Sequence, residues 1–381
     1  MRRTKYQLRK YDFKMILLII VLCVIGYLVL TSAMANDADR DSTLFKQLVG
    51  FGIGGALMIL LSLVDYHFIL RMSAVIYLVM LGLLGAVLLI GVSANNATRW
   101  LNLGFFQIQP SEFAKIGIIV VFAAYFMNHR DRINKPLVLG GALLIYAIPA
   151  FLILKEPDLS TTLVTVFIFL CMLYAAEISY KWIAAAVGAA IPLGSLFIYL
   201  IMQEDQKILA TYQKNRILSW IFPDQYESTG LTTQQDNSVL AISSGQLYGK
   251  GLNNTSLESV KNGEFLSEEN CDFIFAVIGE ELGFVGSVII IVLMALLIFE
   301  CLKIASKAKD LGGRIICVGM ASLLAFQTFV NIGVASGILP NTGLPLPFMS
   351  AGVSSLISTF IGMGMVLNVG LQRRNESLAV W

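Results

Sequence analysis

The sequence predicts an all-α polytopic membrane protein with ten transmembrane helices and a long extracytoplasmic loop between the seventh and the eighth. The composition is 57% apolar and 14% charged, whereas a soluble domain has about 25% charged residues. Apolar runs recur along the whole chain, close to the roughly 20 residues that cross a bilayer. These runs lack strand-like alternation, and a lone segment satisfies its backbone in lipid only as a helix.

Ten apolar runs account for most of the chain and define a single membrane domain over residues 1–381. The polar remainder is a short tail at each end, 1–14 and 372–381, and one large loop, 203–271. The loop contains short apolar stretches, so we expect it to be partly helical. The predicted spans are residues 15–34, 48–64, 72–92, 113–127, 136–154, 159–176, 182–202, 273–302, 315–339 and 348–371.

The distribution of basic residues predicts the orientation. Lys and Arg crowd the N-terminal tail, and after ten alternating crossings most of the others fall on the same side. Asp37, Asp39 and Asp41 fall on the opposite side. Short loops rich in Lys and Arg remain in the cytoplasm. Both termini are therefore predicted to be cytoplasmic, and the loop 203–271 to lie outside.

Several kinds of chemistry are disfavoured by the residues. The five cysteines have no metal-type spacing. His67 and His129 both map to the cytoplasmic side, which argues against a zinc centre or a Ser-His-Asp triad on the outer face. The stretch "SSGQLYGKGL" lacks the strand context and the ending of a P-loop, so no nucleotide site is expected. No internal repeat is legible, which gives no support to a repeat-built transporter.

The eighth predicted span carries carboxylates at Asp272, Glu280 and Glu281. A carboxylate in hydrocarbon costs several kcal/mol unless it is paired, hydrated or neutral. Successive helical residues point about 100° apart, so Glu280 and Glu281 cannot both face one side. We expect the outer half of this helix to line a polar cavity. Asp272, at its start, is either a helix cap or a functional carboxylate.

Three further outer segments hold candidate residues. Glu112 and Lys115 follow Pro110 and share one helical face. They form either a local ion pair or a phosphate-binding Lys held by its Glu. Asp158 fits the N-cap of the sixth span, which does not exclude a contact with substrate. Arg216 is either a snorkelling surface residue or a bidentate phosphate clamp.

Several of these stretches resemble one known family in the same order along the chain. They are "RWLNLGFFQIQPSEFAK", "PDLST", "SSGQLYGKGL", "CDFIFAVIGEELGF" and "NIGVASGILPNTGLPLPFMSAGVSSL". The chain resembles the SEDS proteins, which include RodA, FtsW and SpoVE, and its short tails resemble RodA more than FtsW. It departs from the family at Asn270-Cys271, where His-Thr is usual, and at Ser350–Ser355, "SAGVSS" in place of "SYGGSS".

The resemblance implies polymerisation of lipid II at the outer face of the bacterial cytoplasmic membrane, with release of undecaprenyl pyrophosphate. It places the key carboxylate on Asp272, acting as a base or by holding a divalent cation, Mg²⁺ or Mn²⁺. Lys115 and Arg216 would meet the phosphates, Glu112 would orient Lys115, and Asp158 would support the site. The predicted substrate-binding residues are Glu112, Lys115, Asp158, Arg216, Glu280 and Ser350.

The resemblance also implies partners. They are lipid II, a class B penicillin-binding protein as transpeptidase, other elongation or division proteins, and membrane lipid, with no nucleic acid. Two rival functions remain open from the residues. One is a flippase for the same lipid-linked precursor, for which Glu280 and Glu281 would suit proton coupling. The other is a non-catalytic scaffold for the transpeptidase.

Overall fold

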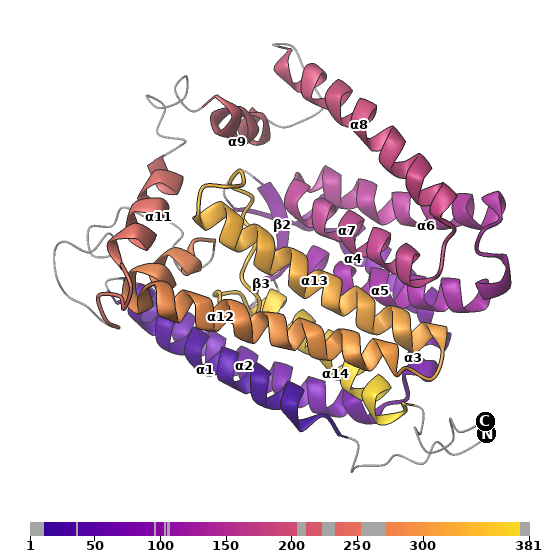
Figure 1. Ribbon diagram of the computed structural model, residues 1–381, viewed down its shortest axis with the longest axis horizontal. Helices are drawn as coiled ribbons and strands as arrows, with labels where there is room; N and C mark the ends of the chain where they lie inside the picture. The colour runs from indigo at the N-terminus through magenta and orange to yellow at the C-terminus, as the bar shows by residue number, and fades with distance from the viewer. Residues whose placement is uncertain are drawn as a thin grey trace.

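The protein is an assembly of membrane-type helices in a computed structural model (Figure 1). The structure describes residues 11–35, 37–94, 97–102, 104, 107–203, 211–222, 233–252 and 272–373. The helices are α1 (Phe13–Ala33), α2 (Arg40–Leu63), α3 (Tyr66–Arg71), α4 (Ser73–Ile90), α5 (Pro110–Asn128), α6 (Pro136–Lys155), α7 (Leu159–Ala175), α8 (Tyr180–Met202), α9 (Thr211–Ile221), α11 (Thr233–Ser244), α12 (Ile274–Ser306), α13 (Leu311–Ala335) and α14 (Val353–Leu371).

Every predicted span coincides with a helix. Among the described residues, eight helices are long and apolar enough to cross a membrane: α1, α2, α4, α5, α6, α12, α13 and α14. The polytopic all-α class is therefore confirmed. α7 is apolar but has only 17 residues, and α8 occupies the seventh predicted span. Membrane crossing by these two helices, and hence the count of ten, stays a prediction.

Several boundaries differ from the prediction for local reasons. α2 begins at Arg40, eight positions before the apolar run, because polar residues extend its first turns. α14 begins only at Val353. The predicted tenth span started at residue 348, inside a proline-containing loop that cannot continue a helix. Within the loop 203–271, the described parts include the helices α9 and α11, which agrees with partial helicity.

The interior of the bundle is formed by α5, α13 and α14, most of whose residues are buried. α14 packs along α2, α13 lies between α12 and α7, and α5 contacts α4, α7 and α13. The other spans expose most of their apolar residues, as helices facing lipid do. α8 runs away from this bundle in Figure 1. The motifs singled out in the sequence lie at one end of the bundle, around the loop between α13 and α14.

A small antiparallel sheet between α4 and α5 was not predicted. β1 (Val92–Ala94) pairs with β2 (Ala97–Asn102), and β2 pairs with β3 (Gln107–Ile108). The strands are too short to give a legible alternation in the sequence. The sheet closes the loop that delivers Arg99 and Gln109 to the neighbouring helix ends.

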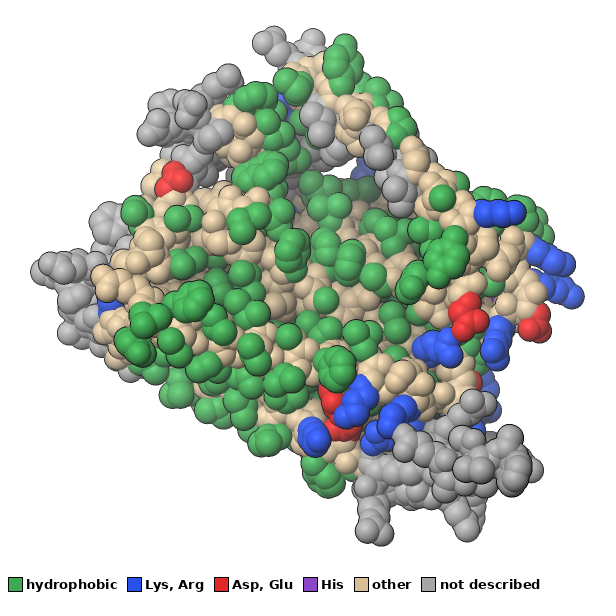
Figure 2. All heavy atoms as spheres, viewed as in Figure 1, with side chains coloured by type: hydrophobic (Ala, Val, Ile, Leu, Met, Phe, Trp, Pro, Cys, Tyr) green, Lys and Arg blue, Asp and Glu red, His purple; other side chains and the backbone are tan. Residues whose placement is uncertain are grey.

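The first and last described segments meet at the same end of the bundle. Arg373 Nη2 lies 3.9 Å from Asp12 Oδ2. This contact places Asp12 and Arg373 at one end of the bundle. The even number of crossings indicated by the distribution of basic residues stays a prediction. Figure 2 shows Lys and Arg side chains gathered toward this end, around the corners where α12 ends and α6 begins.

Candidate functional site

The loop 336–352, between α13 and α14, lies next to several of the candidate residues. Gly337 and Gly343 adopt left-handed backbone conformations, with φ of +78° and +75°. The Asn331 amide on α13 donates to the carbonyl of Leu344 at 2.8 Å and to that of Asp272 at 2.9 Å. One buried side chain thus fixes the loop to the start of α12.

Asp272 and Arg216 meet at Gly343. A Cβ atom at Gly343 would lie 3.2 Å from Asp272 Oδ2 and 3.8 Å from Arg216 Nη1. The glycine therefore lets a carboxylate from the start of α12 and a guanidinium from α9 approach the same backbone. The sequence identified both residues but gave no reason for them to be adjacent, since 56 positions separate them.

Asp272 does not cap α12. The N-cap position belongs to Phe273, and the helix start has no side-chain cap bond. The predicted alternative that Asp272 is a helix cap is therefore wrong. The residue is partly accessible, and its Oδ2 atom lies toward the loop and Arg216.

Asp158 occupies the corner between α6 and α7 and does cap α7. Its Oδ1 accepts from the Thr161 N–H at 3.1 Å and its Oδ2 from the Thr161 hydroxyl at 2.9 Å. Gln109 Nε2 and the Ser111 hydroxyl also approach Oδ2, at 3.3 and 3.5 Å. The hydroxyl of Ser160, two positions after Asp158, donates to the carbonyl of Thr342. The corner is thereby tied to both α5 and the central loop.

Glu112 and Lys115 form the predicted ion pair on the first turns of α5. The Lys115 ammonium lies 2.8 Å from Glu112 Oε1 and 2.7 Å from Oε2. Both side chains are almost fully buried, at 1% and 5% exposure. Glu112 directly follows Ser111, whose hydroxyl approaches Asp158, so the pair lies near the Asp158 corner. Its enclosure supports a structural role.

Glu280 and Glu281 are held by protein partners and do not line an open polar cavity, contrary to the prediction. Lys250 Nζ lies 2.8 Å from Glu280 Oε1, and the Ser32 hydroxyl of α1 donates to Glu281. Both carboxylates are buried, at 1% and 2% exposure. The partners explain why a membrane helix tolerates these charges. The predicted contact of Glu280 with substrate gains no support from this arrangement.

α12 is broken where the predicted span was continuous. Gly283 has φ of +66° and ψ of −165°, so the regular bonds from residues 284 and 285 to carbonyls 280 and 281 cannot form. The loop after α11 replaces them. Lys250 and Gly251 N–H groups donate to the Glu280 and Glu281 carbonyls at 2.9 Å.

The same loop also supplies hydrogen-bond acceptors for the N–H groups that follow the break. The N–H groups of Phe284 and Val285 donate to the carbonyls of Gln246 and Leu247, at 2.9 and 3.1 Å. A Cβ atom at Gly249 would lie 2.1 Å from the Glu281 carbonyl oxygen, so only glycine permits this approach. The stretch "GQLYGKGL" is thus a backbone partner for a broken membrane helix, where unpaired polar groups are costly.

Ser350 shapes the central loop. Its hydroxyl accepts from the Leu346 N–H at 2.8 Å, and its carbonyl accepts from the Gln47 amide of α2 at 3.2 Å. The side chain is 5% exposed. Its predicted contact with substrate remains a prediction, and the observed bonds close the turn that precedes α14.

Sequence reasoning missed Arg99, which braces the α6–α7 corner from β2. Its Nε donates to the Glu156 carbonyl at 3.3 Å, its Nη2 donates to the Pro157 carbonyl, and its Nη1 lies 4.0 Å from Asp158 Oδ1. The sequence offered one indication of its importance, because Arg99 is the first residue of a stretch that carries the family resemblance.

Glu156 was also missed, and it is fully buried beside this corner. Neither carboxyl oxygen has a hydrogen-bond partner among the described residues. Burial, reinforced by the negative charge of Asp158 and opposed by Arg99, raises the pKa of Glu156 to about 8. A mostly protonated Glu156 keeps the corner from carrying two full negative charges near neutral pH.

We expect Glu156→Gln to change the pH dependence of stability. The folded state holds this proton more tightly than the unfolded chain, whose ordinary pKa is 4.5. The free energy of unfolding should therefore fall as pH rises from about 4.5 to about 8, by up to about 1.4 kcal/mol per pH unit. Thermal unfolding in detergent across this range should show a flatter profile for Glu156→Gln. The exposed control Asp131→Asn should keep the wild-type slope; a wild-type slope in Glu156→Gln would refute the assignment.

Unpartnered oxygens gather near Asp272. Asn331 Oδ1, Asn341 Oδ1 and Thr342 Oγ1 are buried and have no hydrogen-bond partner among the described residues. Polar atoms in such positions call for a ligand, an ion or water. They lie on or beside the loop that Asp272 and Arg216 share, so this is the place where a polar ligand would restore missing bonds.

The described residues contain no cluster of three or more His, Cys, Asp or Glu side chains suited to a metal ion. Mg²⁺ is commonly held by one or two carboxylates together with substrate phosphates. Asp272 with the neutral oxygens of Asn341 and Thr342 fits an ion of that kind, and does not form a closed protein cage. An ion held there would supply positive charge near Asp272.

An apolar groove of about 300 Å³ lies between α4, α5 and α14. Pro110 and Phe113 line it where α5 begins, next to Glu112, and Met80 of α4 and Met365 of α14 line it further along. Its walls carry almost exclusively apolar side chains. A chain of hydrocarbon would fit there with its polar end at the first turn of α5.

Comparisons with known proteins agree with this architecture. The family model for FtsW, RodA and SpoVE, described as "Cell cycle protein", matches residues 13–375. A probable peptidoglycan glycosyltransferase FtsW of Bacillus subtilis strain 168 is 34% identical, over 96% of this chain and 92% of its own. The peptidoglycan glycosyltransferase MrdB of Escherichia coli K12 is 33% identical, over 97% and 96%.

Two solved structures have the same fold over nearly the whole chain. One is a chain from a peptidoglycan synthase complex, studied for the coordination of polymerization and crosslinking. It has a TM-score of 0.78 and 27% identity, covering 94% of this chain and 97% of that one. The rod shape determining protein RodA of Thermus thermophilus has a TM-score of 0.70 and 27% identity, covering 96% and 98%.

Proposed function

Because the chain belongs to the FtsW, RodA and SpoVE family, we propose that it is a peptidoglycan glycosyltransferase that polymerises lipid II. The observation that carries this proposal is the meeting of Asp272 and Arg216 at Gly343. A potential base and a permanent cation face one loop, beside unpartnered polar oxygens. Transfer of a sugar from a pyrophosphate requires both kinds of group.

The chemistry can be assigned to these residues. A sugar hydroxyl attacks the anomeric carbon of a second, lipid-linked sugar, and the bond from that carbon to the pyrophosphate oxygen breaks. The hydroxyl proton passes to the Asp272 carboxylate, and the leaving pyrophosphate keeps the bonding electron pair. Arg216 stabilises this charge by bidentate hydrogen bonds. The donor is already activated, so no nucleotide is needed.

The apolar groove supports a substrate carried on a long hydrocarbon chain. It begins at Pro110 and Phe113, on the same first turn of α5 as Glu112. A polyprenyl tail in the groove would leave its pyrophosphate at the level of the α5 and α7 helix starts. Lys115 would then be the second cation for the phosphates, with Glu112 setting its position.

The rival function of a proton-coupled flippase loses the observation that favoured it. Glu280 and Glu281 are buried and already bonded, to Lys250 and Ser32. They stabilise the broken α12, which explains their presence without transport. A scaffold role remains the simpler rival, and it predicts no product from the purified chain.

An assay in detergent distinguishes these functions, because micelles have no two sides between which a lipid can be flipped. Purified protein with lipid II should yield glycan strands, detected on gels after removal of the lipid. The matched inactive sample is Asp272→Asn. Absence of product from a folded wild-type chain that still binds lipid II would refute the enzymatic proposal and favour the scaffold.

We place the protein in the bacterial cytoplasmic membrane with both termini in the cytoplasm. The contact of Arg373 with Asp12 supports termini on one side, and the basic corners at that end support its cytoplasmic location. Asp272 and the central loop would then face outward, where lipid II is consumed.

A transpeptidase of the class B penicillin-binding type is the proposed partner, because polymerisation alone leaves strands uncrosslinked. The similar chain from a synthase complex for polymerization and crosslinking supports such an assembly. Exposed apolar side chains suited to it lie on the outer half of α12 and the loop that clamps its break. They include Phe284 at 63% and Tyr248 at 78% exposure.

We expect co-expressed transpeptidase to co-purify with the protein and to raise its rate of polymerisation. Tyr248→Ala and Phe284→Ala should each weaken co-purification without changing the basal rate. Leu89→Ala is the control, since Leu89 on α4 is 86% exposed and lies away from this surface. Equal rates at all transpeptidase concentrations and no stable association would count against the partner, while leaving the polymerase proposal intact.

A further inference from the structure

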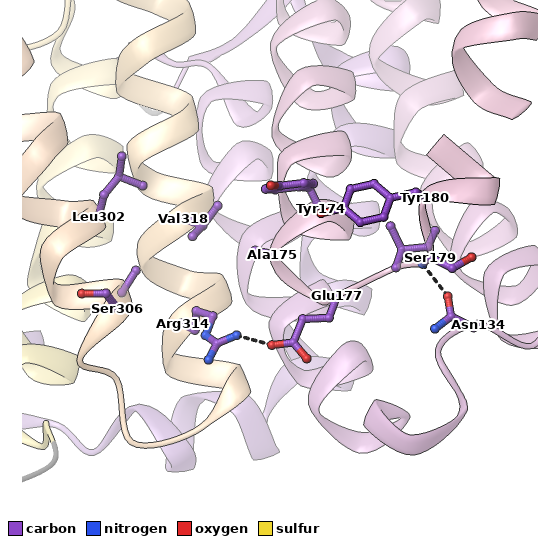
Figure 3. Close-up of a pocket in the computed structure, with 12 residues that line it drawn as sticks. Asn134, Tyr174, Ala175, Glu177, Ser179, Tyr180, Leu302, Ser306, Arg314 and Val318 are labelled. Atoms are coloured by element: carbon purple, nitrogen blue, oxygen red, sulfur yellow. Dashed lines mark hydrogen bonds and ion pairs between the residues drawn. The ribbon is translucent and has the colours of Figure 1, made fainter. Parts of the chain in front are cut away.

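A second cavity, of about 730 Å³, opens at the basic end of the bundle, away from the site described above. Figure 3 shows it as a trough between α12 and α13 on one side and the α7–α8 corner on the other. Tyr174, Tyr180, Leu302 and Val318 form its apolar walls. Glu177 and Arg314 span its lower edge. Its size falls in the range of small-molecule sites, roughly 300–1,000 Å³.

The cavity lies where membrane helices end. α7 ends at Ala175, α8 begins at Tyr180, α12 ends at Ser306 and α13 begins at Leu311. Tyrosines are typical of the boundary between hydrocarbon and water. Two of the wall residues are exposed, Tyr180 at 78% and Leu302 at 44%. The trough therefore offers an apolar side to lipid and a polar edge to water.

The charge at the polar edge comes from Arg314. Its Nη1 lies 2.6 Å from Glu177 Oε1, and the two side chains are 41% and 66% exposed. An ion pair this exposed contributes about 0–1 kcal/mol, so a competing anion can displace the carboxylate. A guanidinium binds phosphate oxygens in a bidentate manner. Basic side chains around this end add a long-range attraction for anions (Figure 2).

We propose that this cavity binds an anionic phospholipid of the adjacent leaflet, with its phosphate on Arg314 and an acyl chain along Leu302 and Val318. The headgroup displaces Glu177, and the chain fills the trough beneath Tyr174 and Tyr180. The ligand class follows from the shape and the charge together. A free phosphate would use Arg314 but leave the apolar walls exposed. This site does not depend on the proposed polymerase function.

Native mass spectrometry of the detergent-purified protein tests the proposal with phosphatidylglycerol as the probe. Phosphatidylglycerol should bind more tightly than phosphatidylcholine. Arg314→Gln should weaken its binding about tenfold, as expected for loss of a charge-assisted contact. Glu177→Gln should strengthen binding, because the competing carboxylate is removed. Ser306→Phe, at an exposed lining position, should reduce binding by filling the trough.

Lys309→Gln is the matched control, because it removes one exposed positive charge from the same end without altering the cavity lining. Equal losses from Arg314→Gln and Lys309→Gln would mean unspecific attraction and would overturn the proposal. Unchanged binding in Arg314→Gln would overturn it as well. Millimolar inorganic phosphate should compete poorly; displacement of the lipid by phosphate alone, with no effect of Ser306→Phe, would identify a free-anion site instead.

Discussion

Asp272→Asn is expected to abolish polymerisation of lipid II while the protein still inserts, folds and purifies. The amide keeps the shape of the carboxylate but can neither accept the hydroxyl proton nor hold a cation. General-base catalysis contributes about 10²–10⁴-fold, so the rate should fall at least about a hundredfold. Strand formation from lipid II in detergent is the measurement.

The structure makes this substitution a clean test. Asp272 caps no helix, and its bond to Asn331 uses the backbone carbonyl, which the variant retains. A loss of activity could not then be ascribed to a lost cap. Asp236→Asn is the control, an exposed carboxylate on α11 in the same outer region. Near wild-type polymerisation by Asp272→Asn would show that this carboxylate is not part of the chemistry.

The helical part of the fold could be predicted from the sequence because lipid permits few alternatives. A run of apolar residues must close its hydrogen bonds internally, so hydropathy alone located the helices at all ten predicted spans. Local spacing likewise predicted the cap at Asp158 and the pair of Glu112 with Lys115, since each depends on neighbours within four positions.

Features that depend on distant segments could not be predicted in the same way. The break at Gly283 requires the loop 245–251, more than thirty positions earlier, to replace its hydrogen bonds. Hydropathy reports only that residues 273–302 are apolar. The carboxylates of Glu280 and Glu281 were recognised as anomalous, but their actual partners, Lys250 and Ser32, lie on other elements.

In the candidate site, too, the sequence identified individual residues but not the contacts between distant segments. Asp272 and Arg216 stood out by residue type and by resemblance, yet their meeting at Gly343 depends on how α9 and the central loop fold over α12. Glu156 gave no signal, because a Glu after Lys155 at a helix end is ordinary in sequence. Only its complete burial next to Asp158 distinguishes it.

Lys115→Met and Glu112→Gln are expected to lower both stability and polymerisation when made singly. Each leaves one buried charge without its partner, which costs about 3–5 kcal/mol. The double variant removes both charges and should regain most of the stability. Its polymerisation should stay as low as in the Lys115 single variant, because the cation for the pyrophosphate is still missing. Thermal unfolding and strand formation, measured on all four proteins, give the two readouts.

A second pair in the same chain serves as the control. Lys303 and Glu300 on α12 have the same spacing, with Nζ 2.7 Å from Oε1, but are 36% and 10% exposed. Glu300→Gln should cost little stability, since water screens the partly exposed Lys303 ammonium that is left behind, and polymerisation should be unchanged. Recovery of polymerisation in the Glu112→Gln, Lys115→Met double variant would reduce that pair to a structural role. Strictly additive stability losses there would show that the two charges do not act as a unit.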